Sequence, residues 1–123
     1  MSAIGPTLEV FFTERLVGQR RASPHTIASY RDTFRLLVSF AARRCKRSPW
    51  QLDFDDLDAK VIGAFLDHLE IERHNSVRTR NVRLVAIRSF YSFAALRHPE
   101  HAGTIGRVLA ISPKRFERNL VTY

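Results

Sequence analysis

The chain has 123 residues, with 20 Lys and Arg against 12 Asp and Glu, and a formal net charge of +8. This length suits one ordinary domain, and 45% hydrophobic with 26% charged residues is typical of a globular protein. A single cysteine excludes a disulfide framework or a thiolate zinc cage within the chain. No apolar run approaches the ~18 residues of a membrane span, and no signal peptide is recognisable. We therefore expect a cytoplasmic domain with no membrane partner.

The charge is unevenly distributed along the chain. Residues 1–50 carry +6, residues 51–75 carry −5 and residues 76–123 carry +7. Two basic blocks on either side of an acidic one predict one positive face and an acidic helix turned away from it. Such a surface favours a polyanionic partner. The simpler alternative is a basic protein whose charges are merely solvated.

Helical periodicity dominates the sequence, so the predicted fold class is all-α. A first helix is expected from Pro6 or Thr7 to Arg20. Its apolar face is Leu8, Phe11, Phe12 and Leu16. Ser23 and Pro24 supply an N-cap and a first-turn proline for a second helix, which the Ser48-Pro49 pair ends.

Three further helices are expected after a loop over residues 50–58. The loop should place its apolar side chains in the core, namely Trp50, Leu52, Phe54 and Leu57. An Asp at position 55, 56 or 58 caps a third helix over residues 59–73. Ser76 caps a fourth helix, Val77 to about Arg97, and a short fifth helix follows from residue 99 or 100 to 109.

The start of the fourth helix carries the strongest chemical signal. At 3.6 residues per turn, its polar and cationic side chains fall within an arc of about 100°. They are Ser76, Thr79, Arg80 and Arg83. The same azimuth is apolar further along, so the Arg end must project beyond the core or meet an environment that accepts charge. Helix N-termini bind anions, and Arg or Asn81 can hold phosphates or read base edges. Alternatively, Arg78, Arg80 and Arg83 are simply solvated.

The second helix repeats this arrangement. Small polar groups occupy its first turns, followed by Arg31: Ser23, His25, Thr26 and Ser29. Such groups can approach a nucleic-acid backbone or a base edge closely. The alternative is capping by Ser23 with His25 exposed to solvent.

No catalytic or metal-binding pattern emerges. The close pair of His98 and His101 is interrupted by Pro99, which indicates a helix start. Cys45 lies beside basic residues but has no obvious base partner. We expect no catalytic residue, no metal, no cofactor and no small-molecule substrate.

Three segments resemble the N-terminal core-binding domain of tyrosine recombinases, the family of phage integrases, Xer-type resolvases and transposon and integron recombinases. Residues 23–31 (SPHTIASYR) resemble one helix start of that domain. Residues 80–91 (RNVRLVAIRSFY) resemble its second groove helix, with an Arg-x-Phe-Tyr ending. Residues 112–120 resemble the interdomain linker. Three motifs in the expected order are more specific than any one of them.

The resemblance implies a SAM-like bundle of four or five helices over residues 1–111 and a basic interdomain linker over residues 112–123. In the family this domain is one half of a clamp around DNA, and its second and fourth helices approach adjacent major grooves. Together with the polar helix starts, this gives the expected contacts to double-stranded DNA. They are His25, Thr26, Ser29, Arg31, Ser76, Arg78, Thr79, Arg80, Asn81, Arg83, Lys114 and Arg115.

The family's catalytic residues are not found in this sequence. They are an Arg, a Lys, a His-x-x-Arg pair and a Tyr nucleophile in a C-terminal domain, and none of the five His here precedes an Arg at that spacing. We expect a recombinase that ends before its catalytic domain, or alternatively a free-standing paralogue. The predicted function is sequence-specific DNA binding, with other recombinase protomers as further partners. Its rival is a basic helical protein-interaction module without DNA specificity, and RNA binding is a weaker third alternative.

Overall fold

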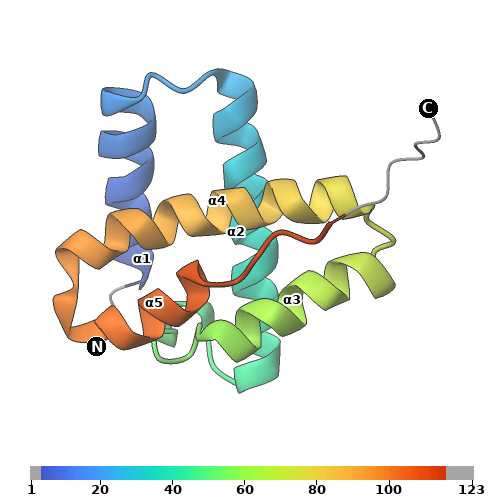
Figure 1. The fold of residues 1–123 in the computed structure, drawn as a ribbon. Helices are drawn as coiled ribbons and strands as arrows, with labels where there is room; N and C mark the ends of the chain where they lie inside the picture. The colour runs from blue at the N-terminus through green and yellow to red at the C-terminus, as the bar shows by residue number, and fades with distance from the viewer. Residues whose placement is uncertain (1–3, 116–123) are drawn as a thin grey trace.

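The structure, a computed structural model, describes residues 4–115 and consists of helices joined by short connections (Figure 1). The elements in chain order are α1 (Ile4–Val10), its π-helical continuation η1 (Phe11–Gln19), α2 (Pro24–Cys45), α3 (Ala59–Ile71), α4 (Val77–Arg97) and α5 (Ala102–Leu109). Two 3₁₀ turns, Pro49–Gln51 and Pro99–His101, complete the fold. The all-α prediction is confirmed, and no strand occurs between residues 4 and 115.

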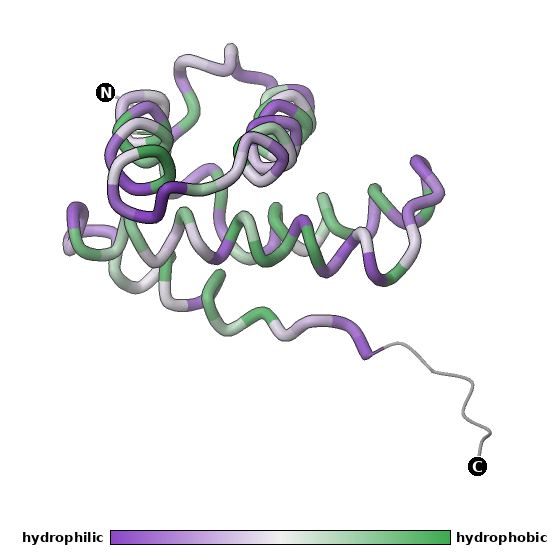
Figure 2. Tube along the Cα trace, turned by 90° about the horizontal axis from the view of Figure 1, so that it is seen from above, coloured by the Kyte–Doolittle hydropathy of each residue, from purple (hydrophilic) through white to green (hydrophobic). Residues whose placement is uncertain are grey.

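The helices pack in crossed layers. In Figure 1, α1 with η1 and α2 form an antiparallel hairpin, and α4 crosses it. Seen from above in Figure 2, the hairpin lies on one side of α4, while α5 and the segment after it lie on the other. The connection between η1 and α2 lies at the end of the hairpin that extends beyond α4. None of the helices in residues 4–115 combines the length and hydropathy of a membrane span.

Three helix starts are fixed by the side chains that the sequence predicts as caps. Ser23, Asp58 and Ser76 have extended backbone conformations, and each accepts a hydrogen bond from the backbone N–H three residues later. The N···O distances are 3.1 Å, 3.0 Å and 3.1 Å. Each cap satisfies a backbone donor that the helix leaves unpaired, which stabilises a helix by about 1 kcal/mol.

Phe11 is the aromatic centre of the core. It is fully buried and packs against Phe34 of α2 and Phe90 of α4, with ring centroids 6.4 Å and 5.5 Å away. The π-helical register of η1 brings Leu16, five residues after Phe11, onto the same buried face. Leu8 and Phe12 are only half-buried, because this register turns them toward α2 at the edge of the hairpin.

The loop before α3 confirms three of its four predicted core residues. Leu52, Phe54 and Leu57 are buried, but Trp50 is 75% exposed. The prediction for Trp50 is therefore wrong. It lies in the 3₁₀ turn that Gln51 closes by accepting the backbone N–H of Ser48 at 3.0 Å, and the core beneath the loop is filled by its neighbours.

Candidate nucleic-acid interface

Arg83 holds α4 against α2 where the two helices cross. Its Nη1 donates to Thr33 Oγ1 at 2.9 Å and to the backbone oxygen of Ser29 at 3.3 Å. Its Nη2 donates to Asp32 Oδ2 at 3.0 Å. The side chain of Arg83 is only 17% exposed, so water competes little for these bonds. One guanidinium of α4 thus donates hydrogen bonds to three acceptors of α2 where the two helices meet.

This contact sets the positions of both predicted helix starts. At 1.5 Å per residue, the start of α2 lies about 8 Å from Ser29 and the start of α4 about 9 Å from Arg83. Both starts therefore extend from one crossing point. The structure brings Ser29 and Arg83 together, as a common binding side requires.

Arg31 does not join this cluster. Its guanidinium lies 5.9 Å from the ring centroid of Phe12, so it faces η1 rather than α4. It lines an apolar groove between α1, η1 and α2 instead. Of the predicted contacts on α2, Arg31 is the one that points to a different side of the helix from the Arg83 contact.

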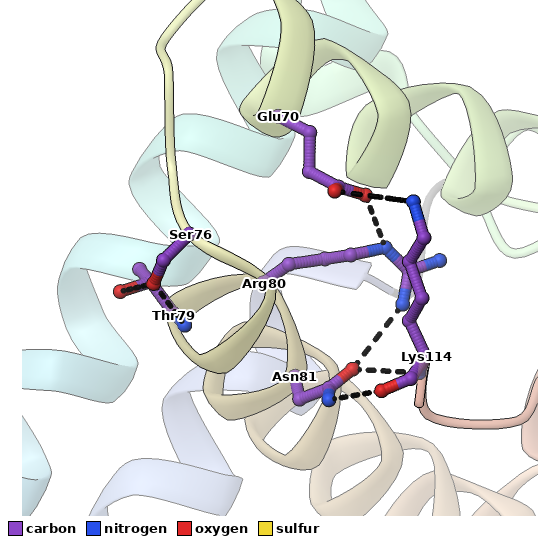
Figure 3. A network of polar contacts seen from close by, with 6 residues as sticks. All are labelled: Glu70, Ser76, Thr79, Arg80, Asn81 and Lys114. Atoms are coloured by element: carbon purple, nitrogen blue, oxygen red, sulfur yellow. Dashed lines mark hydrogen bonds and ion pairs between the residues drawn. The ribbon is translucent and has the colours of Figure 1, made fainter. Parts of the chain in front are cut away.

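Arg80 extends toward α3 and the segment after α5 (Figure 3). Its Nε lies 3.1 Å from Glu70 Oε1, an ion pair without an aligned N–H bond, and its side chain is 11% exposed. The same carboxylate accepts both of its hydrogen bonds from Lys114 Nζ at 3.2 Å. Asn81 Oδ1 accepts the backbone N–H of Lys114 at 2.8 Å, and Asn81 Nδ2 donates to the Lys114 backbone oxygen at 2.7 Å. These bonds thus join Glu70 to three predicted contact residues, Arg80, Asn81 and Lys114. A fourth predicted contact residue, Arg115, is exposed beside Lys114.

The acidic helix is not fully turned away from the basic face. Glu70, near the end of α3, is the shared partner of Arg80 and Lys114. In the preceding loop, Asp56 lies 3.7 Å from Arg47. The expectation of a separate acidic side is wrong at these points, because the carboxylates neutralise nearby cations across helix contacts.

Both helix starts contain the same pair of hydroxyl groups. Ser23 Oγ donates to Thr26 Oγ1 and Ser76 Oγ donates to Thr79 Oγ1, each at 3.1 Å. His25 and Arg78 lie next to these pairs and are exposed. The cap hydroxyls are thus occupied within the fold, and the neighbouring side chains remain open to a ligand.

The exposed side of α4 differs from the arc that the sequence emphasised. Arg80 and Arg83 face Glu70 and Asp32, whereas a second stripe faces solvent at i, i+4, i+7, i+11 and i+14. This stripe is Arg78, Val82, Val85, Ser89 and Ser92. Val82 and Val85 are 47% and 55% exposed. Sequence reasoning missed it, although two valines on a polar helix face are a readable signal.

The pKa values of Asp32 and Cys45 are shifted by their structural surroundings. A hydrogen bond from Arg35 is the main cause that lowers the pKa of Asp32 below its usual value; burial opposes it, and the hydrogen bond and charge of Arg83 add to the lowering. Burial raises the pKa of the Cys45 thiol, so this cysteine is not an activated nucleophile. Between residues 4 and 115, no three His, Cys, Asp or Glu side chains gather as metal ligands.

Comparison with known proteins agrees with this architecture. Residues 10–98 match the family model described as "Phage integrase, N-terminal SAM-like domain". The chain is 55% identical over 122 residues to a protein of Sinorhizobium fredii (strain NBRC 101917 / NGR234) named "Putative integrase/recombinase y4rC". It is 48% identical over 112 residues to "Putative integrase/recombinase y4rD" of the same strain.

These alignments cover 99% and 91% of the chain but only 37% and 40% of the two relatives, so the chain spans about two fifths of their length. No solved structure matches the chain. The five-helix bundle has the SAM-like fold that the sequence resemblance implied. This chain belongs to the phage integrase N-terminal SAM-like domain family.

Proposed function

We propose that this domain binds double-stranded DNA sequence-specifically, as the DNA-binding part of a site-specific tyrosine recombinase acting in DNA integration and recombination. Residues 1–111 are the core-binding domain and residues 112–123 are the linker to a catalytic domain. The observation that carries the proposal is the Arg83 contact with Ser29 and Asp32, which makes two capped helix starts extend from one point.

Helix starts are suited to DNA because they offer unpaired backbone N–H groups and the positive end of the helix dipole. The exposed groups beside them are His25 and Arg78. A guanidinium such as that of Arg78 can bind the O6 and N7 atoms of guanine together, and a polar group such as Thr26 can bind either a base or a phosphate. We assign these residues, with Ser29 and Thr79, to direct contact, and we assign the hydroxyl of Ser76 to capping α4.

Arg80 and Arg83 receive a different role. Each is largely buried and is paired with a carboxylate, Glu70 or Asp32. A direct contact with DNA would have to replace that pair. We therefore propose that they position α4 against α3 and α2, so that the helix starts keep their relative placement when DNA binds.

In this proposal, the segment after α5 contacts the phosphate backbone of DNA. Lys114 and Arg115 are exposed, and the main chain of Lys114 is fastened to Asn81. Through this contact with Asn81, the positive charges of both residues lie beside the start of α4, where a DNA strand would pass. Residues 116–123, the remainder of the predicted linker, lie outside the described residues.

Titration of duplex DNA tests the proposal. Duplexes would first be selected from a random pool, and fluorescence anisotropy would then compare the selected duplex with its single strand and with RNA of the same sequence. If about six phosphates are engaged, log affinity falls against log salt with a slope near −5. Equal affinity for all three nucleic acids, or an affinity that salt does not change, would exclude sequence-specific duplex binding.

A basic protein-interaction module remains the second candidate, and one feature favours it. The groove between α1, η1 and α2 is lined by apolar side chains, among them Leu8, Phe12 and Val38. Its signature would be self-association or capture of a partner without salt-sensitive DNA affinity. Sedimentation of the domain with and without duplex DNA separates the two functions.

A further inference from the structure

We infer that a second, separate feature of the domain is a phosphate seat between η1, α2 and α4, which holds the DNA backbone beside the helix starts. This inference rests on the proposed function and adds a site to it. The groove has a volume of about 300 Å³, and three arginines line it: Arg15, Arg20 and Arg88. None of the three belongs to the helix-start residues that the sequence pointed to.

The three arginines, of which Arg20 is exposed and Arg15 and Arg88 are half-buried, differ from Arg80 and Arg83 in their partners. Arg80 and Arg83 each face a carboxylate, but within residues 4–115 no carboxylate forms an ion pair with Arg15, Arg20 or Arg88. The Nε of Arg15 is buried and has no hydrogen-bond partner. Arg80 and Arg83 bury an unpartnered Nε as well, but each lies beside a carboxylate, whereas Arg15 has none among the described residues. The groove therefore carries positive charge that no acid balances.

Packing against an aromatic ring holds the Arg15 side chain in place, although no acid lies beside it among the described residues. Its guanidinium carbon lies 5.4 Å from the ring centroid of Phe93, a cation–π contact on a residue that is itself 7% exposed. A guanidinium held beside a ring in this way can still donate hydrogen bonds to phosphate oxygens through its terminal nitrogens.

Hydroxyl groups complete the lining. Tyr30 of α2 and Ser89 and Ser92 of α4 border the same groove. Hydroxyls donate to phosphate oxygens without adding charge of their own. Three cations and three neutral donors, contributed by three helices, match a phosphodiester and offer nothing to a cation.

The groove is continuous with the proposed reading surface. Ser89 and Ser92 belong to the exposed stripe of α4 that begins at Arg78. The helix rises about 21 Å over the 14 steps from Arg78 to Ser92, which corresponds to about six base steps at 3.4 Å per step. Arg20 also immediately precedes the connection to the start of α2. A strand whose bases meet the two helix starts would therefore bring a phosphate to this groove.

Charge-matched variants test the seat. The groove variant is Arg15→Gln with Arg88→Gln, and its control is Arg43→Gln with Arg107→Gln, two exposed arginines without a carboxylate partner among the described residues. Both lose two positive charges. We expect the groove variant to bind the selected duplex at least tenfold more weakly and its salt slope to shrink by about 2, against a loss of about threefold or less in the control.

A second pair of variants keeps the test decisive if the first groove variant misfolds. Ser92→Asp adds a negative charge at the exposed rim of the groove, and Ser39→Asp adds the same charge to an exposed position of α2 outside it. Only the former should weaken duplex binding, by about tenfold. Equal losses in groove and control variants would overturn the seat while leaving duplex binding by the parent intact. Failure of the parent to bind duplex DNA would instead refute the proposed function.

An experiment with inorganic phosphate distinguishes a free anion from a DNA phosphate as the ligand of the groove. Phosphate should shift the Arg15 Nε–H resonance, and a bound duplex should prevent that shift by occupying the groove. A phosphate-induced shift that persists unchanged in the duplex complex would mean that the groove takes a free anion, and would overturn its assignment to the DNA backbone.

Discussion

The side-chain amide of Asn81 binds both main-chain polar groups of Lys114, a residue 33 positions further along the chain. It accepts one hydrogen bond and donates another, as a neighbouring strand would. This pairing fastens the segment after α5 to the start of α4 (Figure 3). The placement of that segment therefore depends on the same helix turn that we assign to DNA.

Asn81→Ala should release this segment. Loss of two hydrogen bonds, together worth about 1–2 kcal/mol, should speed hydrogen exchange at the Lys114 amide by about 5- to 30-fold. Asn81→Asp keeps the acceptor for that amide and should give an intermediate rate. Asn75→Ala is the control and should leave the Lys114 amide unchanged. An amide whose exchange is the same in Asn81→Ala would show that the segment is held by other contacts.

Glu70→Gln should strengthen duplex binding and weaken the fold. The carboxylate of Glu70 pairs with Arg80, which holds α4 against α3, and with Lys114, which is exposed. Its removal loosens the first contact and makes the Lys114 ammonium available to phosphate. We expect about two- to fivefold tighter binding at low salt, which fades as salt screens the added charge.

The matched control for Glu70→Gln is Glu72→Gln, because Glu72 is exposed on the same helix end and has no ion-pair partner among residues 4–115. It removes the same charge and should change affinity less. Tighter binding of equal size in both variants would mean that net charge alone, rather than release of Lys114, sets the effect.

Arg83→Ala and Arg78→Ala should separate folding from binding. Arg83→Ala removes the donor of the buried Thr33 hydroxyl and one of the two donors of Asp32, which keeps Arg35, so we expect the free energy of unfolding to fall by about 1–3 kcal/mol. Arg78 is exposed, and its loss should change stability by less than about 0.5 kcal/mol.

Duplex binding should show the reverse order for the two arginines once folding is taken into account. Arg78→Ala should cost about 1–3 kcal/mol of binding if it reads a base, and Arg78→Lys should recover only part of it because the bidentate geometry is lost. Urea titration and anisotropy on the same samples measure both quantities. A stable Arg83→Ala domain whose two helix starts keep their amide chemical shifts, but which fails to bind DNA, would assign Arg83 to direct contact rather than to positioning.

The sequence predicts best those features that depend on residues within one helical turn of each other. The caps at Ser23, Asp58 and Ser76 act within one turn, so their residue types alone fix the helix starts. Helical periodicity groups Arg83 with Arg80 on one arc of α4, but the acceptor of Arg83, Asp32, is 51 residues away, and no local pattern reveals such a partner. The π-helical register of η1 and the exposure of Trp50 likewise follow from tertiary packing. The same holds for the groove of three arginines, whose members come from separate helices.

Acid should weaken the α2–α4 crossing through Asp32. Its pKa is lower in the folded protein than in the unfolded chain, because Arg35 and then Arg83 donate hydrogen bonds to its charged form. A lowered pKa means that the ionised carboxylate stabilises the fold above about pH 4 and that this contribution is lost as pH falls through the folded value. Asp32→Asn should therefore be less stable than the parent at neutral pH, and the difference should shrink as the pH falls below the usual range of an Asp carboxyl. Urea midpoints across this range measure it, and a difference that stays constant with pH would show that the charge of Asp32 does not hold the crossing.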